Sequence, residues 1–108
     1  MKTDERIIKI VDQYGYDAQS RQCIEEMAEL TQAINKFWRK QLKCGQISIM
    51  AAEFRNKEYE NVLEEIADTQ IMLEQMKVFF DCEERIEILI DEKLKRQIER
   101  INNKQKNR

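Results

Sequence analysis

The sequence contains no histidine and no proline, and only two glycines among its 108 residues. Without histidine, a Ser-His or Cys-His nucleophile pair is excluded. The Glu-x-x-His ligand pairs of di-iron helical bundles are excluded for the same reason. No glycine-rich loop of the Walker type is present, so any phosphate must be bound by helix side chains. With 37% charged and 42% apolar residues, the composition predicts an all-α protein.

Long apolar runs and a large excess of one charge are also missing. No stretch approaches the 18 or so apolar residues of a membrane-spanning helix. The amino terminus, Met1–Arg6, has no apolar core of the kind found in signal peptides. A formal charge of -2 gives no general attraction to nucleic acids or anionic membranes. We therefore expect a cytosolic protein with neither a membrane nor a nucleic acid as its partner.

The three cysteines are Cys23, Cys44 and Cys82, an odd number without close spacing. This pattern argues against a disulfide framework and against a thiolate zinc site. Cys23 fits the apolar side of a helix, and structural roles are favoured for all three. A redox role is left without support.

The helical patterns divide the chain into four segments. The first two are separated by Gly15, and Asp17 or Ser20 is available as the cap of the second. The polar stretch 55–58 leaves open whether residues 49–80 form one helix or two, with room for an extra short helix between 46 and 58. Asp81 and Glu84 resemble a capping box. The expected helices cover residues 4–14, 17–43, 59–80 and 82–101. They predict a single domain over 1–101 that is folded as an antiparallel four-helix bundle. Residues 102–108 are expected to form a frayed polar tail.

A repeated acidic motif organises the pattern. Glu25-Glu26-Met27-Ala28-Glu29 matches Glu64-Glu65-Ile66-Ala67-Asp68 after a shift of 39 positions. Because a helix turns by about 100° per residue, the first motif lies beside an apolar stripe and the second beside an equivalent one. The expected stripes are Cys23, Met27, Leu30, Ile34 and Phe37, and then Val62, Ile66, Thr69, Leu73, Met76 and Phe80.

The same geometry brings acidic side chains together. Glu26 and Glu29 project roughly 60° and 120° to one side of the first stripe, and Glu65 and Asp68 have the same offset from the second. If the helices pack along their stripes, four carboxylates converge at the edge of the core. Such a cluster needs a compensating cation. An oxygen-only site favours Mg²⁺, with Mn²⁺ as a substitute, over zinc or copper. The alternative is a solvated acidic face without a metal.

Basic side chains form a third pattern. Lys93, Arg96 and Arg100 share one stripe of the last helix. If this stripe overlooks the carboxylates, it offers donors for phosphate oxygens. The alternative is a solvated helix end that complements its own dipole.

Glu25-Glu26-x-x-Glu29 and Glu65-x-x-Asp68 resemble the signature of the MazG-like members of the all-α nucleoside triphosphate pyrophosphohydrolase superfamily. The resemblance covers roughly residues 14–100. It implies a homodimer or homotetramer that hydrolyses a nucleoside triphosphate to the monophosphate and pyrophosphate by means of Mg²⁺-activated water. By position, Glu26, Glu29, Glu65 and Asp68 are then metal ligands, and Glu25 is a catalytic accessory near the metal or the attacking water.

The resemblance extends to the last helix with departures. The family pattern Asn-x-Lys-Phe-x-Arg-Arg corresponds here to Asp91-Glu92-Lys93-Leu94-Lys95-Arg96-Gln97, so Lys93 and Arg96 inherit a phosphate-binding role while Asn and the second Arg are replaced. The two motifs are also further apart than in compact members, which leaves base recognition open. Two alternatives remain, a helical adaptor or regulator that binds another helical protein, and a nucleotide-binding module without catalysis.

Overall fold

The computed structural model describes residues 3–45 and 50–106. This part of the chain forms three α-helices, α1 (Glu5–Cys44), α2 (Lys57–Phe80) and α3 (Glu83–Lys106), with a short 3-10 helix, η1 (Ala51–Glu53), before α2. No strand occurs among these residues, which confirms the all-α prediction. The predicted four-helix bundle is not confirmed, because three helices are found and the first two expected helices belong to the single element α1, which is kinked at Gly15.

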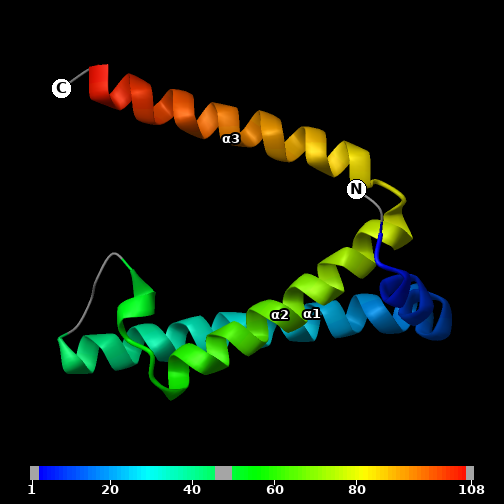
Figure 1. The fold of residues 1–108 in the computed structure, drawn as a ribbon, viewed down its shortest axis with the longest axis horizontal. Helices are drawn as coiled ribbons and strands as arrows, with labels where there is room; N and C mark the ends of the chain where they lie inside the picture. The colour runs from blue at the N-terminus through cyan, green and yellow to red at the C-terminus, as the bar shows by residue number, and fades with distance from the viewer. Residues whose placement is uncertain (1–2, 46–49, 107–108) are drawn as a thin grey trace.

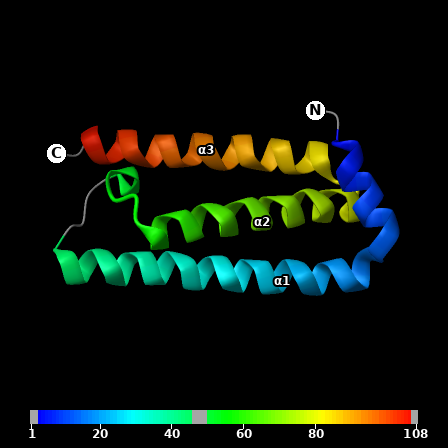
Figure 2. The ribbon, with the colours of Figure 1, turned by 60° about the horizontal axis from the view of Figure 1, so that its bottom comes forward.

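α1 is interrupted at Gly15 without a loop. Gly15 has φ 80° and ψ 168°, whereas its neighbours on both sides are helical. Glycine adopts this conformation easily because it has no Cβ. The segment before Gly15 therefore turns across the end of the other helices (Figure 2). The cap of this segment is Asp4, whose carboxylate accepts a hydrogen bond from the Arg6 backbone N–H at 2.9 Å.

α1 and α2 form an antiparallel hairpin that contains most of the core (Figure 1). Phe37 of α1 and Tyr59 of α2 pack with their ring centroids 6.4 Å apart near one end. Near the other end, Gln19 donates a hydrogen bond to Gln75 at 2.8 Å. The buried side chains, with less than 9% of their surface exposed, are Val11, Cys23, Ala33, Phe37, Gln41, Thr69, Met72 and Gln75.

The buried side of each hairpin helix differs from the predicted stripe. Met27 and Ile34 were expected in the core but are 42% and 49% exposed. Ile66 and Leu73 on α2 are 38% and 43% exposed. Both helices are rotated by roughly 40° toward the side that carries the acidic residues. Small side chains on that side, such as Ala33 and Thr69, allow the helices to approach, and the larger aliphatic side chains are left outside.

α3 does not join a bundle. α2 ends at Asp81, which has the left-handed φ of 48°, so Asp81 caps α2 and is not the predicted cap of the last helix. α3 then runs back beside the hairpin but apart from it (Figure 1). Its helical structure continues to Lys106, so residues 102–106 of the predicted frayed tail are helix, and residues 107 and 108 of that prediction lie outside the described residues.

The apolar side of α3 is consequently exposed. We predicted that Ile86, Ile90, Leu94, Ile98 and Ile101 supply a buried face, but no residue of α3 is buried. Leu94 is 61% exposed and Ile98 is 56% exposed. The first turn of α3 is held to the amino terminus by a hydrogen bond of 3.3 Å from the Thr3 hydroxyl to the Glu83 carboxylate. Within the described residues, extensive helix packing is thus limited to α1 and α2.

The connection between α1 and α2 contains the predicted short helix, as the single turn η1. Residues 46–49 of the predicted 46–58 segment lie outside the described residues. Asn56 caps α2, its side chain accepting a hydrogen bond from the Tyr59 N–H at 2.8 Å. Within the described ranges, none of the helices combines the length and the apolar character that crossing a membrane requires.

Candidate metal centre

Three glutamates from the two motifs meet in the middle of the hairpin. Glu26 of α1 and Glu65 of α2 are half-buried, and Glu29, one turn further along α1, is exposed. One carboxylate oxygen of each residue lies within 4.8 Å of the other two. This spacing is compatible with three oxygens around one hard cation, whose ligands lie at 2.0–2.6 Å.

The rotation of the hairpin helices explains why two of these acids enter the interface. The residues of α1 that face α2 follow a 3-4 spacing, Cys23, Glu26, Leu30, Ala33 and Phe37. Glu26 therefore occupies an interface position between two apolar neighbours. Glu65 has the equivalent place on α2, between Val62 and Thr69. The repeated motif of the sequence thus places two glutamates in the same α1–α2 interface.

Thr69 contacts both helices near the three glutamates. It is 6% exposed, and its hydroxyl lies 2.7 Å from the Glu65 carbonyl oxygen and 3.4 Å from the Glu26 carbonyl oxygen. The first contact is the usual bond to the preceding turn, and the second crosses to α1. Thr69 was placed in the apolar stripe on the basis of spacing, and its polar role was not predicted. The sequence offered one indication of this role, because the shift of 39 positions aligns the polar Thr69 with the apolar Leu30.

The two interface glutamates carry unsatisfied oxygens. Oε2 of Glu26 and Oε2 of Glu65 are both buried without a hydrogen-bond partner. The other oxygen of Glu26, Oε1, accepts a hydrogen bond from Gln22 at 2.8 Å. The ion pairs in the described part of the chain involve other acids, namely Asp4, Glu74 and Asp91. A buried carboxylate oxygen without a donor is costly, so the arrangement fits an oxygen-seeking cation.

Electrostatic repulsion within the group is visible at Glu29. The neighbouring carboxylate of Glu26, followed by that of Glu65, raises the pKa of Glu29 above its usual value of 4.5. Desolvation acts in the same direction as a smaller cause. Like charges that are close together disfavour the ionised form. A bound cation would oppose this effect by favouring the ionised form of Glu29.

The fourth predicted ligand lies outside this group. Asp68 is exposed on α2, one turn after Glu65, and does not belong to the described acids that share the 4.8 Å limit. Its side chain is one methylene shorter than that of Glu29, the residue it matches in the repeat. Glu25, the predicted catalytic accessory, is exposed on α1 next to Glu26. The structure therefore brings together three of the four predicted ligands.

The predicted phosphate-binding residues are not beside the glutamates within one chain. Lys93, Arg96 and Arg100 are exposed on α3. α3 lies apart from the part of the hairpin that carries the three glutamates (Figure 1). The basic stripe is formed as predicted, but it does not overlook the acids in the single chain.

We compared the chain with protein-family models, with characterised proteins and with solved structures, and none of the three comparisons found a match. The geometry of the three glutamates and the resemblance of the two motifs are therefore the observations that bear on function.

Proposed function

We propose that this protein is a cytosolic, Mg²⁺-dependent nucleoside triphosphate pyrophosphohydrolase. The observation that carries the proposal is the meeting of Glu26, Glu29 and Glu65 around two buried carboxylate oxygens that have no donor. A solvated acidic face would leave its oxygens in water. The resemblance of both motifs to the MazG-like pattern supports the same reaction class.

In this proposal the three glutamates hold the cation, and Asp68 completes the ligand set from the adjacent turn of α2. Mn²⁺ would replace Mg²⁺ at the same oxygens. When bound, the ion supplies charge neutralisation on the phosphates and lowers the pKa of a coordinated water. Gln22 restrains the Glu26 carboxylate through its hydrogen bond of 2.8 Å. Glu25 orients the attacking water from the exposed side of the group.

The reaction breaks one phosphoanhydride bond. The water oxygen bonds to the α-phosphorus, the bond between the α-phosphorus and the bridging oxygen breaks, and pyrophosphate leaves with the bridging oxygen. Lys93, Arg96 and Arg100 bind the phosphate oxygens of the substrate from α3. The active form is a homodimer or homotetramer with the site near a subunit interface. We further propose that the two α1–α2 hairpins assemble as a MazG-like antiparallel four-helix bundle in that assembly.

The test is product analysis by anion exchange, with a panel of canonical and modified ribo- and deoxyribonucleoside triphosphates. We expect a monophosphate and pyrophosphate with Mg²⁺ and no turnover with chelator. Glu26→Gln and Glu65→Gln should each reduce turnover by at least about 100-fold with unchanged helical content, whereas Glu64→Gln, an exposed neighbour, should not. A diphosphate and inorganic phosphate as products, or full activity of the Glu26→Gln/Glu65→Gln double variant, would contradict the mechanism.

A second candidate function is a helical adaptor that binds another helical protein. The observation in its favour is the amount of exposed apolar surface on the hairpin, including Met27, Ile34 and Trp38. An adaptor would be inactive against the whole panel, and its binding would be insensitive to Glu26→Gln. The product analysis therefore separates the two functions.

A further inference from the structure

α3 carries an apolar stripe that no other part of the described chain covers. Ile90, Leu94, Ile98 and Ile101 are each 48–61% exposed, and with Ile86 they recur every three or four residues along one side of the helix. Exposed apolar side chains in such a continuous row mark an interaction surface. Leu94 is the middle member of the row.

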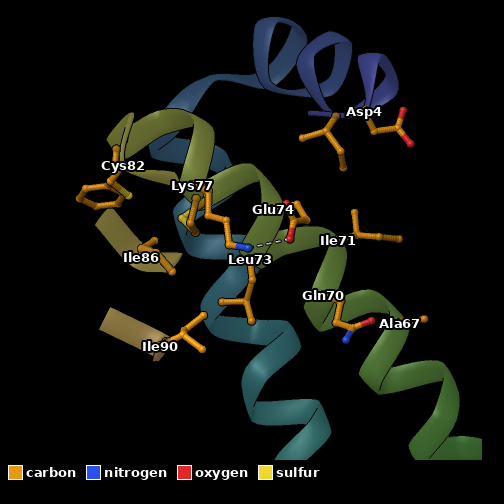
Figure 3. Close-up of a pocket in the computed structure, with 13 residues that line it drawn as sticks. Asp4, Ala67, Gln70, Ile71, Leu73, Glu74, Lys77, Cys82, Ile86 and Ile90 are labelled. Atoms are coloured by element: carbon orange, nitrogen blue, oxygen red, sulfur yellow. Dashed lines mark hydrogen bonds and ion pairs between the residues drawn. The ribbon is translucent and has the colours of Figure 1, made fainter. Parts of the chain in front are cut away.

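The beginning of this stripe forms one wall of an apolar groove. Figure 3 shows Ile86 and Ile90 of α3 on one side and Leu73 of α2 beside them. Phe80, which is 61% exposed, and Met76 also belong to the apolar lining. The groove has a volume of about 990 Å³, enough for several side chains. The stripe and the groove are thus one continuous surface.

The surface area indicates how large the missing contact is. A compact chain of 13.1 kDa exposes about 6,400 Å², whereas this chain exposes 9034 Å². The Cα radius of gyration is 17.9 Å, compared with about 13 Å for a compact domain of this length. The excess of about 2,600 Å² per chain is sufficient for an obligate dimer, whose interface buries 2,000–5,000 Å².

The charges of α3 are divided between its two halves. The amino half, residues 83–92, has five acidic residues and a single arginine. The carboxyl half, residues 93–106, has six basic residues and a single glutamate. A second α3 running in the opposite direction would place the basic half of each helix beside the acidic half of the other. A parallel arrangement would place like charges together.

From these observations we infer that α3 pairs with α3 of a second copy of this chain in antiparallel orientation, with Leu94 at the two-fold axis. Because the stripe extends about equally on both sides of Leu94, this register matches apolar side chains along its full length. Ile101 of the partner subunit then lies at the level of Ile86 and enters the mouth of the groove. The contact is isologous, so each copy covers the groove of the other.

The first experiment measures the mass in solution by light scattering over a concentration series. The unaltered protein should be a dimer of the 13.1 kDa chain. Leu94→Lys should weaken the dimer by about 100-fold or more, because two lysines meet at the axis and two leucines lose their contact. Ile88→Lys, at a position on the opposite side of α3 that is 52% exposed, is the matched control and should leave the dimer intact. A monomeric unaltered protein, or an intact Leu94→Lys dimer, would overturn the inference.

The second experiment tests the orientation and does not depend on the lysine variant. Ile86→Cys and Ile101→Cys are prepared separately with Cys44 and Cys82 replaced by serine, and then mixed and oxidised. Antiparallel pairing should give disulfides between the two variants. It should give few between two copies of Ile86→Cys, whose positions are about 24 Å apart along the helices. Disulfides mainly between identical variants would indicate parallel pairing and overturn the inference. Both experiments are independent of the proposed hydrolase activity.

Discussion

Glu26 of α1 and Glu65 of α2 are 39 positions apart in the sequence, yet each buries its Oε2 atom without a hydrogen-bond partner in the same helix interface. Two like charges in one helix interface oppose folding unless a cation compensates them. The stability of the hairpin is therefore expected to respond to metal, and the raised pKa of Glu29 should make it respond to pH as well.

Mg²⁺ should stabilise the protein through these glutamates. At a concentration 100 times the dissociation constant, linkage predicts a gain of about 2.7 kcal/mol, measured as a higher melting temperature with Mg²⁺ than with chelator. Glu65→Gln should remove most of this gain. The metal-free Glu65→Gln protein should be at least as stable as the metal-free unaltered protein, because one repelling charge is gone.

Glu64→Gln is the control for the metal effect, since Glu64 is the exposed neighbour of Glu65. It should retain the full response to Mg²⁺. An equal loss of the response in both variants would mean that bulk negative charge, and not the three-glutamate group, binds the ion.

Without metal, the pH dependence of stability should show the raised pKa of Glu29. The folded protein then binds this proton more tightly than the unfolded chain, whose group has the usual value of 4.5. The free energy of unfolding should fall as the pH rises from 4.5 through the folded-state pKa, and the decrease should then stop. Denaturant titrations in chelator at several pH values measure this, and Glu29→Gln should flatten the profile in that window. An unchanged profile would contradict the assignment.

Thr69 should stabilise the hairpin through its hydroxyl. Thr69→Val preserves the shape of the side chain but removes the contacts to the Glu65 and Glu26 carbonyl oxygens. We expect a loss of about 1 kcal/mol in the free energy of unfolding. Thr31→Val is the matched control, because the Thr31 hydroxyl is exposed and bonds only to Met27 of its own helix at 3.0 Å. Equal effects would show that the contact across the helices is not important.

The hydrogen bond from Gln19 to Gln75 should contribute to the stability of the hairpin, because the Gln75 side chain is only 1% exposed and cannot bond to water instead. Gln19→Leu removes the donor and leaves the Oε1 atom of Gln75 unsatisfied in the core, at a cost of about 1–3 kcal/mol. Chemical denaturation should show partial recovery in the Gln19→Leu/Gln75→Leu double variant. Gln32→Leu, at an exposed position of α1, should change stability by less than about 0.5 kcal/mol. No recovery in the double variant would indicate that volume and not the amide bond decides the effect.

The local pattern predicted much of the secondary structure correctly. The long helices, the break at Gly15 and the start of the last helix near Cys82 follow from spacing, from glycine and from the polar residues at the helix ends. The predicted boundary between the first and second helices is present as a kink at Gly15 within α1, because a single glycine can redirect a helix without a loop. The tail prediction was wrong because residues 102–106 simply continue α3.

The sequence by itself determined that this chain is helical and that the acids of its two motifs have the same offset from their apolar stripes, since both properties depend on local spacing. The tertiary structure decided which side of each stripe is buried. Apolar side chains cover a wider arc of α1 and α2 than one helix contact can bury, so periodicity does not select between Met27 and Ala33. The close approach at Ala33 and Thr69 makes that selection, and it moves Glu26 and Glu65 into the interface. The separation of α3 was equally beyond the local pattern, because an apolar stripe requires a partner but does not specify whether that partner belongs to the same chain.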